Sequence, residues 1–335
     1  MTTSSAGADG MQRSRLFLHI GQPKTGTTSL QSFLALNRGK LIEEGWLYPK
    51  AGRQASGHHQ FAKFFRNDPP DWIQDADPEL VRKQLRGEIK RTGAQNVVIS
   101  SEAFFIIREP AKVHDYFKLF DVTIVVYLRR QDEWLESLYR EQLKNGATDL
   151  PPAEYLKRVS KSLNYWQVLE RWRKVFGEAK IIVVPFERCG KAISSEAMFL
   201  KAVELESGTG LTPVTAKNER LNRDCLQFLA RMKTSRRIGR RFALIKDALA
   251  EYSKANPDEP AHLYFFPPKV RAQLVARYRE SNDRVAKLYL GESQGALFHQ
   301  APPDPSEPWN QHPELRAQRA VLISEYLLER FIALE

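Results

Sequence analysis

The sequence predicts an α/β protein with a mostly parallel central sheet, helices on both faces of the sheet and a helical C-terminal part. Three observations favour this fold class: continuous apolar runs rich in Val and Ile, helical spacing between these runs, and loss of the strand signal beyond about residue 190. Continuous apolar runs are typical of parallel strands, because crossover helices bury both faces of such a sheet. The alternation therefore indicates βαβ units.

The individual elements follow from this pattern. Strands are predicted at 15–20, 96–100, 121–128 and 179–186. Helical spacing predicts one helix after Thr28, one over about 78–92, one after Gln131, one over about 153–176 and one over 267–291. After a proline-rich link, a last helix has an apolar stripe that we expect to contact the core or a partner, formed by Ile323, Tyr326, Leu327 and Phe331.

Length and composition set the class of protein. The chain has 335 residues, of which 42% are hydrophobic, so it can bury a sizeable core. We expect residues 1–14 to form a disordered tail and 301–335 to form the link and a C-terminal helix packed on the domain or on a partner. Cys189 and Cys225 are too few for a disulfide framework. With no leader-like or membrane-spanning apolar run, a cytoplasmic protein is expected.

The net charge of +11 favours anionic partners without identifying them. The basic residues concentrate in 231–246, which carries seven Lys or Arg and no acid. Such a run is either a solvated surface or the rim of an anion site, and Arg236 and Arg240 are its central candidates. It could serve a nucleotide or guide an acidic glycan, and the sequence does not choose between them.

The segment GQPKTGTTS at 21–29 has the composition of an anion-binding loop. Gly21 and Gly26 allow the backbone to approach a ligand, and the amides from Thr25 onward point to an anion at the positive end of the next helix. Ligands of open parallel sheets bind at this carboxyl edge. Lys24 can reach oxygens of the bound group. Further donors are the hydroxyls of Thr27, Thr28 and Ser29.

The position of the lysine distinguishes this loop from a Mg-dependent triphosphate loop. Such a loop has its lysine directly after the second glycine, whereas here Thr27 follows Gly26 and Lys24 precedes it. A lysine at this position can neutralise a leaving oxygen directly. PKTGTT at 23–28 resembles the 5′-phosphosulfate loop P-K-[ST]-G-T-[ST] of sulfotransferases that use 3′-phosphoadenosine 5′-phosphosulfate (PAPS). The resemblance implies a single P-loop-like sulfotransferase domain over 15–300, with no metal.

A second family element follows the third strand-like run. Family members bind the 3′-phosphate of the nucleotide with an Arg at the strand end and a Ser eight residues later. Here Arg129 and Ser137 have this spacing, whereas Leu138 stands eight residues after Arg130. The guanidinium group suits phosphate because it donates two parallel hydrogen bonds. The alternative role for Arg129 is an ion pair with Glu133.

The resemblance covers about 15–187, where VVPFERC is similar to the strand that precedes a Glu in many members. GHH after the first helix, and SNDRVAKLYLG followed by LF, are similar to a bacterial branch whose acceptors are poorly characterised. The donor is therefore implied and the acceptor is left open. Candidates are a hydroxyl or an amine of a saccharide, a glycolipid or another lipid-linked molecule, or a small metabolite. The sequence also leaves open whether the chain forms a homodimer.

Two kinds of side chain compete for the role of general base, because the acceptor must lose a proton. Glu102 follows the second strand at the edge where cytosolic members place a histidine, although a buried acid paired with amides or a lysine is equally consistent. His58 and His59 follow a glycine-bearing loop in a region that lines the acceptor pocket of family members, although adjacent loop histidines are often surface residues. We place Glu102 ahead of His59, and Lys24 at the leaving oxygen.

Two rival functions share part of this pattern. A P-loop kinase of small molecules would have the same fold and much of the loop, but it would bind ATP with Mg²⁺. A nucleic-acid-binding protein would use the net charge of +11. The basic run lacks interleaved aromatic residues and a helix-turn-helix pattern, so nucleic acid is not an expected partner.

Overall fold

The computed structural model describes residues 13–69, 71–187, 194–205, 210–214, 221–232, 241–259, 263–291, 296–310 and 315–332. Contacts within the chain divide it into two compact units. Unit 1 comprises Met1–Leu128 and Gln167–Val214, and unit 2 comprises Arg129–Trp166 and Thr215–Glu335. No helix of the described residues is long and apolar enough to cross a membrane.

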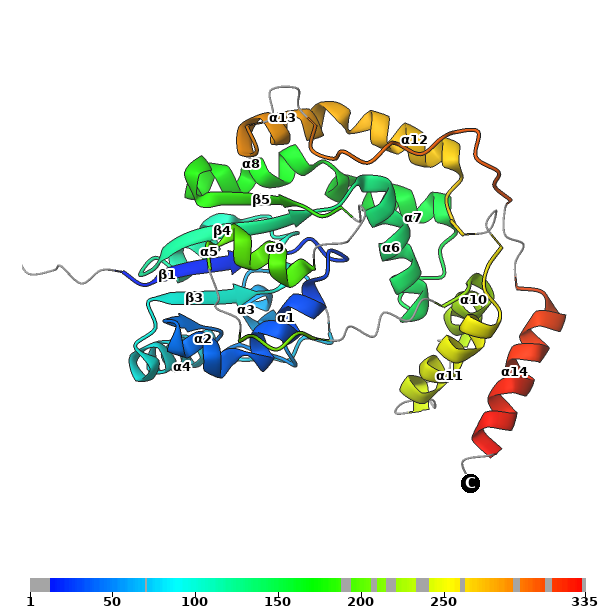
Figure 1. Ribbon diagram of the computed structural model, residues 1–335, viewed down its shortest axis with the longest axis horizontal. Helices are drawn as coiled ribbons and strands as arrows, with labels where there is room; N and C mark the ends of the chain where they lie inside the picture. Colours follow the sequence, from blue (N-terminus) through cyan, green and yellow to red (C-terminus); the bar gives the residue numbers. More distant parts are fainter. Residues whose placement is uncertain are drawn as a thin grey trace, which may run out of the picture. The chain divides into compact units, whose positions relative to one another are not determined.

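Unit 1 is built on a five-stranded sheet whose strand pairs are all parallel, in the order β2-β3-β1-β4-β5 (Figure 1). Four strands lie where the apolar runs predict them, which confirms the α/β class: β1 Arg15–His19, β3 Asn96–Ser100, β4 Asp121–Leu128 and β5 Ile181–Pro185. The fifth, β2 Trp46–Leu47, has two residues and was not predicted. Strand β1 is central. After β1 the chain forms β2 and β3 on one side of it, and after β3 it crosses to form β4 and β5 on the other side. Such a divergence marks the ligand-binding edge of α/β sheets.

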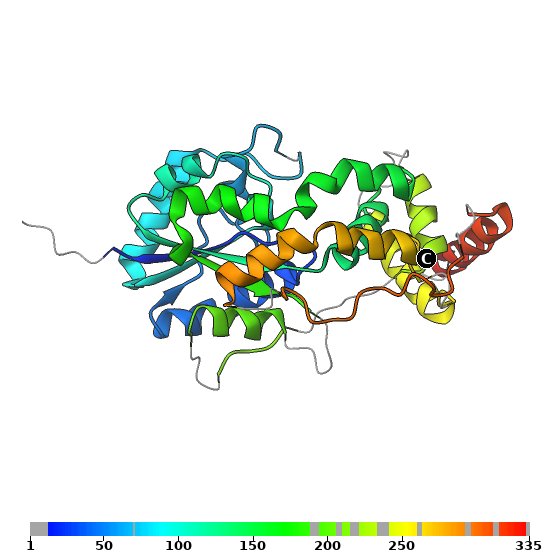
Figure 2. The ribbon, with the colours of Figure 1, turned by 90° about the horizontal axis from the view of Figure 1, so that it is seen from above.

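Helices cover both faces of this sheet, as Figure 2 shows. On one face, Phe17, Val98, Val125 and Tyr127 pack against the apolar sides of α1 (Thr27–Leu36) and α9 (Ser195–Ala202). Neighbouring residues of the strands point to the opposite face and are equally buried. Both faces of the sheet are therefore core, which explains the continuous apolar runs. The shorter elements of unit 1 are α2 Arg38–Glu43, α3 His59–Lys63, η1 Glu102–Phe104, α5 Pro110–Tyr116 and η3 Glu178–Lys180.

Helix α4 shows how closely local signals can fix an element. It spans Pro78–Thr92, as predicted. The Asp77 carboxylate caps its first turn by accepting from the amide of Glu79 at 2.9 Å, and Gly93 ends it with a φ of 65°. The preference of aspartate for the N-cap, of proline for the first turn and of glycine for the C-cap accounts for both boundaries.

The described part of unit 2 is helical, in agreement with the predicted loss of strands. Its helices surround a core that includes Trp134, Tyr155, Leu226, Leu249 and Phe266. Helix α8 starts in this unit and continues into unit 1. The helices are α6 Gln131–Lys144, α7 Pro152–Val159, η2 Ser160–Leu163, α8 Tyr165–Phe176, α10 Arg223–Met232, α11 Arg241–Ala255, α12 Pro268–Arg277, α13 Arg279–Tyr289 and α14 Ala317–Ile332.

The predictions of one continuous helix over 153–176 and one over 267–291 were wrong, because each region is interrupted. The first is interrupted by η2 and the second at Tyr278. The two breaks contact each other: the Tyr278 hydroxyl donates to the carbonyl of Ser160 at 2.9 Å, and the Ser281 hydroxyl donates to the Asn164 side chain at 3.0 Å. Tertiary contacts therefore override the local helical spacing.

The apolar stripe of the last helix faces the core of unit 2. Ile323 and Leu327 on α14 are buried, and Tyr326 stacks edge-on against Tyr252 of α11 with ring centroids 5.1 Å apart. An ion pair between Arg330 and Glu251 joins the same two helices at 2.7 Å. Ile323 and Leu327 therefore belong to the hydrophobic core of unit 2.

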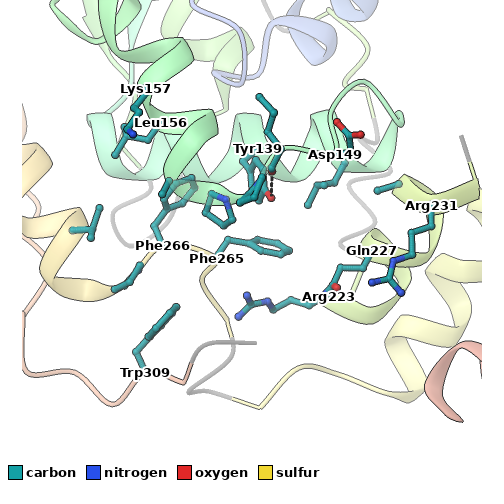
Figure 3. A pocket seen from close by; sticks show the side chains of 18 residues that line it. Tyr139, Asp149, Leu156, Lys157, Arg223, Gln227, Arg231, Phe265, Phe266 and Trp309 are labelled. Atoms are coloured by element: carbon teal, nitrogen blue, oxygen red, sulfur yellow. Dashed lines mark hydrogen bonds between the residues drawn. The ribbon is translucent and has the colours of Figure 1, made fainter. Parts of the chain in front are cut away.

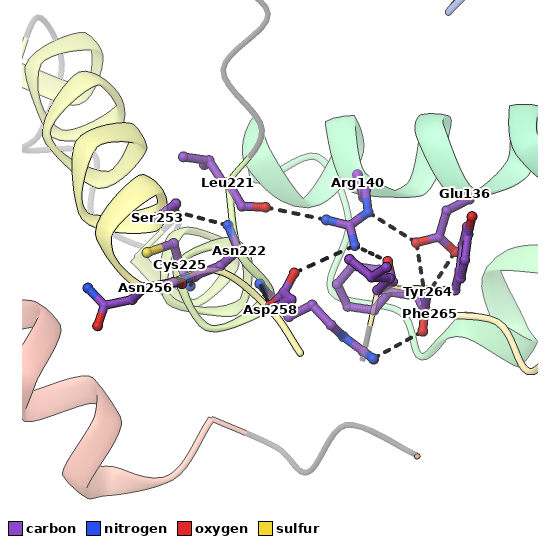
Figure 4. Close-up of polar contacts among 12 residues, drawn as sticks. Glu136, Arg140, Leu221, Asn222, Cys225, Ser253, Asn256, Asp258, Tyr264 and Phe265 are labelled. Atoms are coloured by element: carbon purple, nitrogen blue, oxygen red, sulfur yellow. Dashed lines mark hydrogen bonds and ion pairs between the residues drawn. The ribbon is translucent and has the colours of Figure 1, made fainter. Parts of the chain in front are cut away.

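Buried charges tie the segments of unit 2 together (Figure 4). The Glu136 carboxylate accepts from the Arg140 guanidinium at 3.1 Å and from the amide of Phe265 at 2.9 Å. Arg140 donates onward to the carbonyls of Leu221 and Leu263. Because each buried charge has opposite charge or backbone groups around it, burial is tolerated, and Leu221 before α10 and the segment 263–265 after α11 are held in place.

Candidate functional site

The loop from Gly21 to Gly26 joins the central strand β1 to helix α1. Backbone hydrogen bonds continue the β1–β4 pairing into the loop: the amide of Gln22 donates to the carbonyl of Tyr127 at 2.9 Å, and the amide of Tyr127 donates to the carbonyl of Gly21 at 2.6 Å. Further along the loop, Lys24 has a φ of 67°. A lysine in the left-handed region is uncommon, and such strain is concentrated at functional sites.

Helix α1 presents its N-terminus to this loop without a side-chain cap. Gly26 is the N-cap residue, and the first helical hydrogen bond runs from the amide of Leu30 to the carbonyl of Gly26 at 3.0 Å. Within the described residues, no hydrogen bond satisfies the amides of Thr27, Thr28 and Ser29. Uncapped amides at the positive end of a ten-residue helix form a site suited to an anion.

The hydroxyl groups of the loop differ in what they contact. Thr25 is buried and donates to the carbonyl of Gln22 at 2.6 Å, so its hydroxyl braces the loop. The Ser29 hydroxyl donates to the Glu196 carboxylate of α9. Thr25 and Ser29 can therefore offer a ligand their amides but not these hydroxyl protons. Thr28 is exposed, so its hydroxyl is accessible from solvent.

Both glycines of the loop are required by close contacts. A Cβ on Gly21 would lie 2.8 Å from the Cα of Glu102, and a Cβ on Gly26 would lie 2.7 Å from the Ser195 hydroxyl. The Ser195 hydroxyl in turn donates to the carbonyl of Gly26 at 3.1 Å. Gly21 thus places Glu102 directly against the loop, and Gly26 allows α9 to pack there.

Glu102 lies at the start of η1, after the end of β3, and is half-buried. Its carboxylate accepts from the Gln31 side-chain amide at 3.1 Å. Gln31 is buried on α1 and also lies 3.4 Å from the Ser100 hydroxyl. Gln31 therefore orients Glu102 from the helix that follows the loop. Sequence reasoning missed Gln31, although a polar residue on the apolar side of the predicted helix was a signal.

His59 lies beside Glu102. Its Nδ1 is 2.9 Å from the Ser101 hydroxyl, and its ring packs edge-on against Trp72 with centroids 4.9 Å apart. The side chain is 8% exposed. Burial lowers the pKa of His59 below its usual value, and the Glu102 carboxylate opposes this shift. A neutral imidazole next to a carboxylate can accept a proton at neutral pH.

His58 points into the interior. Its Nε2 donates to the carbonyl of Pro49 at 2.9 Å, and its Nδ1 accepts from the amide of Ser100 at 3.1 Å. Burial lowers the pKa of His58 to about 3, so the ring is neutral. Because both nitrogens bind the backbone, His58 positions the neighbouring segments and has no ring nitrogen left for an acceptor.

His19, the last residue of β1, is a further buried histidine that sequence reasoning did not select. Its Nδ1 is 2.8 Å from the Ser100 hydroxyl, and its ring packs against Tyr127. Burial lowers the pKa of His19 to about 3. A histidine inside an apolar strand run was the available signal. It extends the polar cluster that Gln31 and Glu102 form at the ends of β1 and β3.

Arg129 and Ser137 belong to unit 2. Arg129 directly follows β4, and its Nε donates to the Glu133 carboxylate at 3.1 Å, which is the ion pair considered from the sequence. Glu133 and Ser137 are four residues apart on α6, so they share the helix face that Arg129 approaches. Arg130 is buried and pairs with Asp132 at 2.6 Å. In the basic run, Arg236 and Arg240 lie outside the described residues.

Comparisons with known proteins add limited information. No family model matches the chain. A curated relative from Archaeoglobus fulgidus, described as an uncharacterized protein, is 27% identical over 208 residues, which is 58% of this chain and 54% of the relative. The chain thus spans about half the length of that relative. A crystal structure described as a sulfotransferase from Alicyclobacillus acidocaldarius is 17% identical, with a TM-score of 0.43 over 75% of this chain and 98% of that one.

Proposed function

We propose that this protein is a sulfotransferase that moves a sulfonyl group from PAPS to a hydroxyl or amine of an acceptor. The observation that carries the proposal is the loop from Gly21 to Gly26. It combines uncapped helix amides with a lysine held ahead of the second glycine. This arrangement suits a 5′-phosphosulfate whose leaving phosphate is neutralised by Lys24 rather than by a metal ion.

The proposed reaction is an in-line displacement at sulfur. The acceptor oxygen or nitrogen forms a bond to sulfur while the bond from sulfur to the bridging phosphate oxygen breaks, leaving adenosine 3′,5′-bisphosphate. Charge develops on the leaving oxygen, where Lys24 and the amides of Thr27 and Thr28 stabilise it. Gly26 and Thr25 complete the binding loop through their backbone, and Ser29 contributes its amide.

The acceptor proton is assigned to Glu102 or His59. Glu102 is held against the loop by Gly21 and oriented by Gln31, which favours it as the base. His59 is neutral through burial and interacts with Glu102, so it is the competing base or a residue that contacts the acceptor. His58 is omitted from the acceptor site because its ring nitrogens bind the backbone.

For the 3′-phosphate of the donor, we assign Arg129 and Ser137. Arg129 pairs with Glu133 through Nε, and the planar guanidinium group is suited to phosphate because it can donate two parallel hydrogen bonds. The neighbouring Arg130 pairs with Asp132 instead. The domain over 15–300, a cytoplasmic location and a bacterial source belong to the same proposal. The acceptor class is open, with carbohydrate and lipid-linked hydroxyls foremost.

The test is transfer of labelled sulfur. The purified protein is incubated with ³⁵S-labelled PAPS and a panel of saccharides, glycolipids, amines and small alcohols, and labelled products are separated from the donor. Enzyme-dependent labelling of one acceptor class, without added metal, is expected. If the protein binds adenosine 3′,5′-bisphosphate but labels nothing in the panel, the tested compounds are excluded as acceptors. A protein that does not bind the bisphosphate contradicts the proposal.

One rival is specific enough to test beside it. A P-loop kinase would also use a loop after β1, and the acid at the end of β3 could help to hold Mg²⁺. Thermal stabilisation by ATP with Mg²⁺, and not by adenosine 3′,5′-bisphosphate, would favour that kinase.

A further inference from the structure

Unit 2 contains a cavity of about 1150 Å³ that the proposed sulfonyl transfer does not use (Figure 3). It lies between the C-terminal half of α6, helices α7 and α10, the segment 265–270 and Trp309. Ligand pockets for small molecules usually span about 300–1,000 Å³. The cavity is therefore large enough for a ligand with a long apolar part.

One side of the cavity is apolar and aromatic. Tyr139, Leu156, Phe265, Phe266 and Trp309 are among its lining side chains. In Figure 3 the rings of Phe265, Phe266 and Tyr139 converge on the same space. Aromatic side chains bury large apolar areas, so this side favours an acyl chain or a similar apolar group.

The cationic part of the lining comes mainly from α10, where the guanidinium carbon of Arg223 lies 4.2 Å from the centroid of the Phe265 ring. Arg223, Gln227 and Arg231 are spaced four residues apart and all line the cavity, so one face of this helix supplies two guanidinium groups and an amide. Lys157 on α7 adds a third cation, against one lining acid, Asp149. The net charge of the lining favours an anion.

The apolar wall is held in a fixed position. The Glu136 carboxylate accepts from the amides of Phe265 and Phe266 at 2.9 and 3.4 Å. The indole of Trp309 donates to the carbonyl of Tyr264 at 2.9 Å, and Arg223 donates to the same carbonyl at 3.0 Å. A wall fixed by buried hydrogen bonds loses little entropy when a ligand binds.

We propose that this cavity binds a long-chain carboxylate, with its acyl chain on the aromatic wall and its head group toward the cationic row of α10. A neutral hydrocarbon would place no negative charge beside Arg231, whose guanidinium donates to the carbonyl of Leu315 at 3.0 Å, and a small phosphate would leave the apolar wall exposed. An amphiphilic anion matches both the cationic and the apolar part of the lining. The residues that line the cavity differ from those assigned to the transfer reaction.

Displacement of a fluorescent polyene fatty acid tests the proposal with the full-length protein. The bound probe is titrated with hexadecanoate, hexadecanol and butyrate, which vary head group and chain length separately. Hexadecanoate is expected to displace the probe at concentrations about tenfold lower than hexadecanol, because a charged hydrogen bond is lost with the alcohol. Butyrate is expected not to compete.

Variants locate the site. Arg231→Gln should weaken hexadecanoate about tenfold and leave hexadecanol nearly unchanged, whereas Arg279→Gln, an exposed arginine of the same unit, should change neither. Ala230→Phe fills the cavity and should weaken the binding of both hexadecanoate and hexadecanol. If circular dichroism shows that this variant does not fold, Val270→Phe replaces it as the filling variant. Equal displacement by acid and alcohol, equal effects of Arg231→Gln and Arg279→Gln, or full binding by a folded filling variant would overturn the proposal.

Discussion

Two regions of the molecule bury polar groups in different ways. Where β1 and β3 end in unit 1, burial keeps the rings of His19 and His58 neutral. In unit 2, full charges are buried as bridges between segments: the Asp132 carboxylate binds Arg130 at 2.6 Å and Arg271 at 2.9 Å.

This difference shows that buried charge alone does not mark a catalytic site. The ion pairs of unit 2 satisfy one another and link helices, which is a structural role. The cluster of unit 1 surrounds an uncapped helix N-terminus and a strained Lys24. We therefore expect substitutions in this cluster of unit 1 to change turnover and substitutions in the bridges of unit 2 to change stability.

Replacement of the loop lysine should have the largest effect. Lys24→Ala removes the cation assigned to the leaving oxygen, so we expect kcat to fall at least about hundredfold. Lys83→Ala removes an exposed lysine of α4 and should leave kcat unchanged. Turnover is measured with labelled PAPS. Unchanged kcat and donor affinity in Lys24→Ala would show that the lysine has no role.

The base should be identified by pH profiles of Glu102→Gln and His59→Gln. Replacement of the true base should lower kcat about 10²–10⁴-fold and should also remove the fall in rate at acidic pH. Activity through His59 falls as pH falls through its pKa, which burial places below the usual 6.5. Because Glu102 raises that pKa, Glu102→Gln should move this fall in rate to lower pH if His59 is the base, and abolish it if Glu102 is. Glu109→Gln, at an exposed acid, is the control.

The bridges of unit 2 should respond in stability. Asp132→Asn leaves the guanidinium groups of Arg130 and Arg271 without their shared carboxylate, so the free energy of unfolding should fall by about 3–5 kcal/mol. Urea unfolding measures it. Glu280→Gln breaks the exposed pair with Arg284 and should cost less than about 1 kcal/mol. Similar losses in the two variants would contradict the distinction between bridging and surface ion pairs.

A smaller loss is expected at the first loop glycine. Gly21→Ala meets a φ of 89° and places its Cβ against the backbone of Glu102, so a loss of about 1–3 kcal/mol is expected. Gly93→Ala has a φ of 65° and open space around it, and should cost about 1 kcal/mol. Activity should fall in the first variant only. Retained activity in Gly21→Ala would show that the close contact between the loop and Glu102 is not needed for turnover.

The sequence predicted the elements whose signal is local. Strands buried on both faces are continuous Val and Ile runs, and α4 has an Asp cap, a Pro start and a Gly end. It did not predict β2, since two residues carry no periodicity, or the helix breaks at 160–163 and Tyr278, which depend on contacts between segments more than 100 residues apart.

The candidate site divides in the same way. The loop and its lysine are a contiguous motif, so they were selected from spacing alone. Gln31, Ser195 and Glu196 were missed because their roles depend on hydrogen bonds to Glu102, Gly26 and Ser29 that form only in the folded chain. The cavity of unit 2 is formed by helix faces that look like ordinary core stripes in the sequence.

Calorimetric titration with the reaction product tests the central claim most directly. The account predicts that adenosine 3′,5′-bisphosphate binds without metal, at least about tenfold more tightly than adenosine 5′-monophosphate, since the latter lacks the 3′-phosphate. Arg129→Ala should remove most of this difference, and Arg279→Gln should keep it. Equal affinity for the two nucleotides in the wild type, or binding of ATP with Mg²⁺ in place of the bisphosphate, would contradict the account.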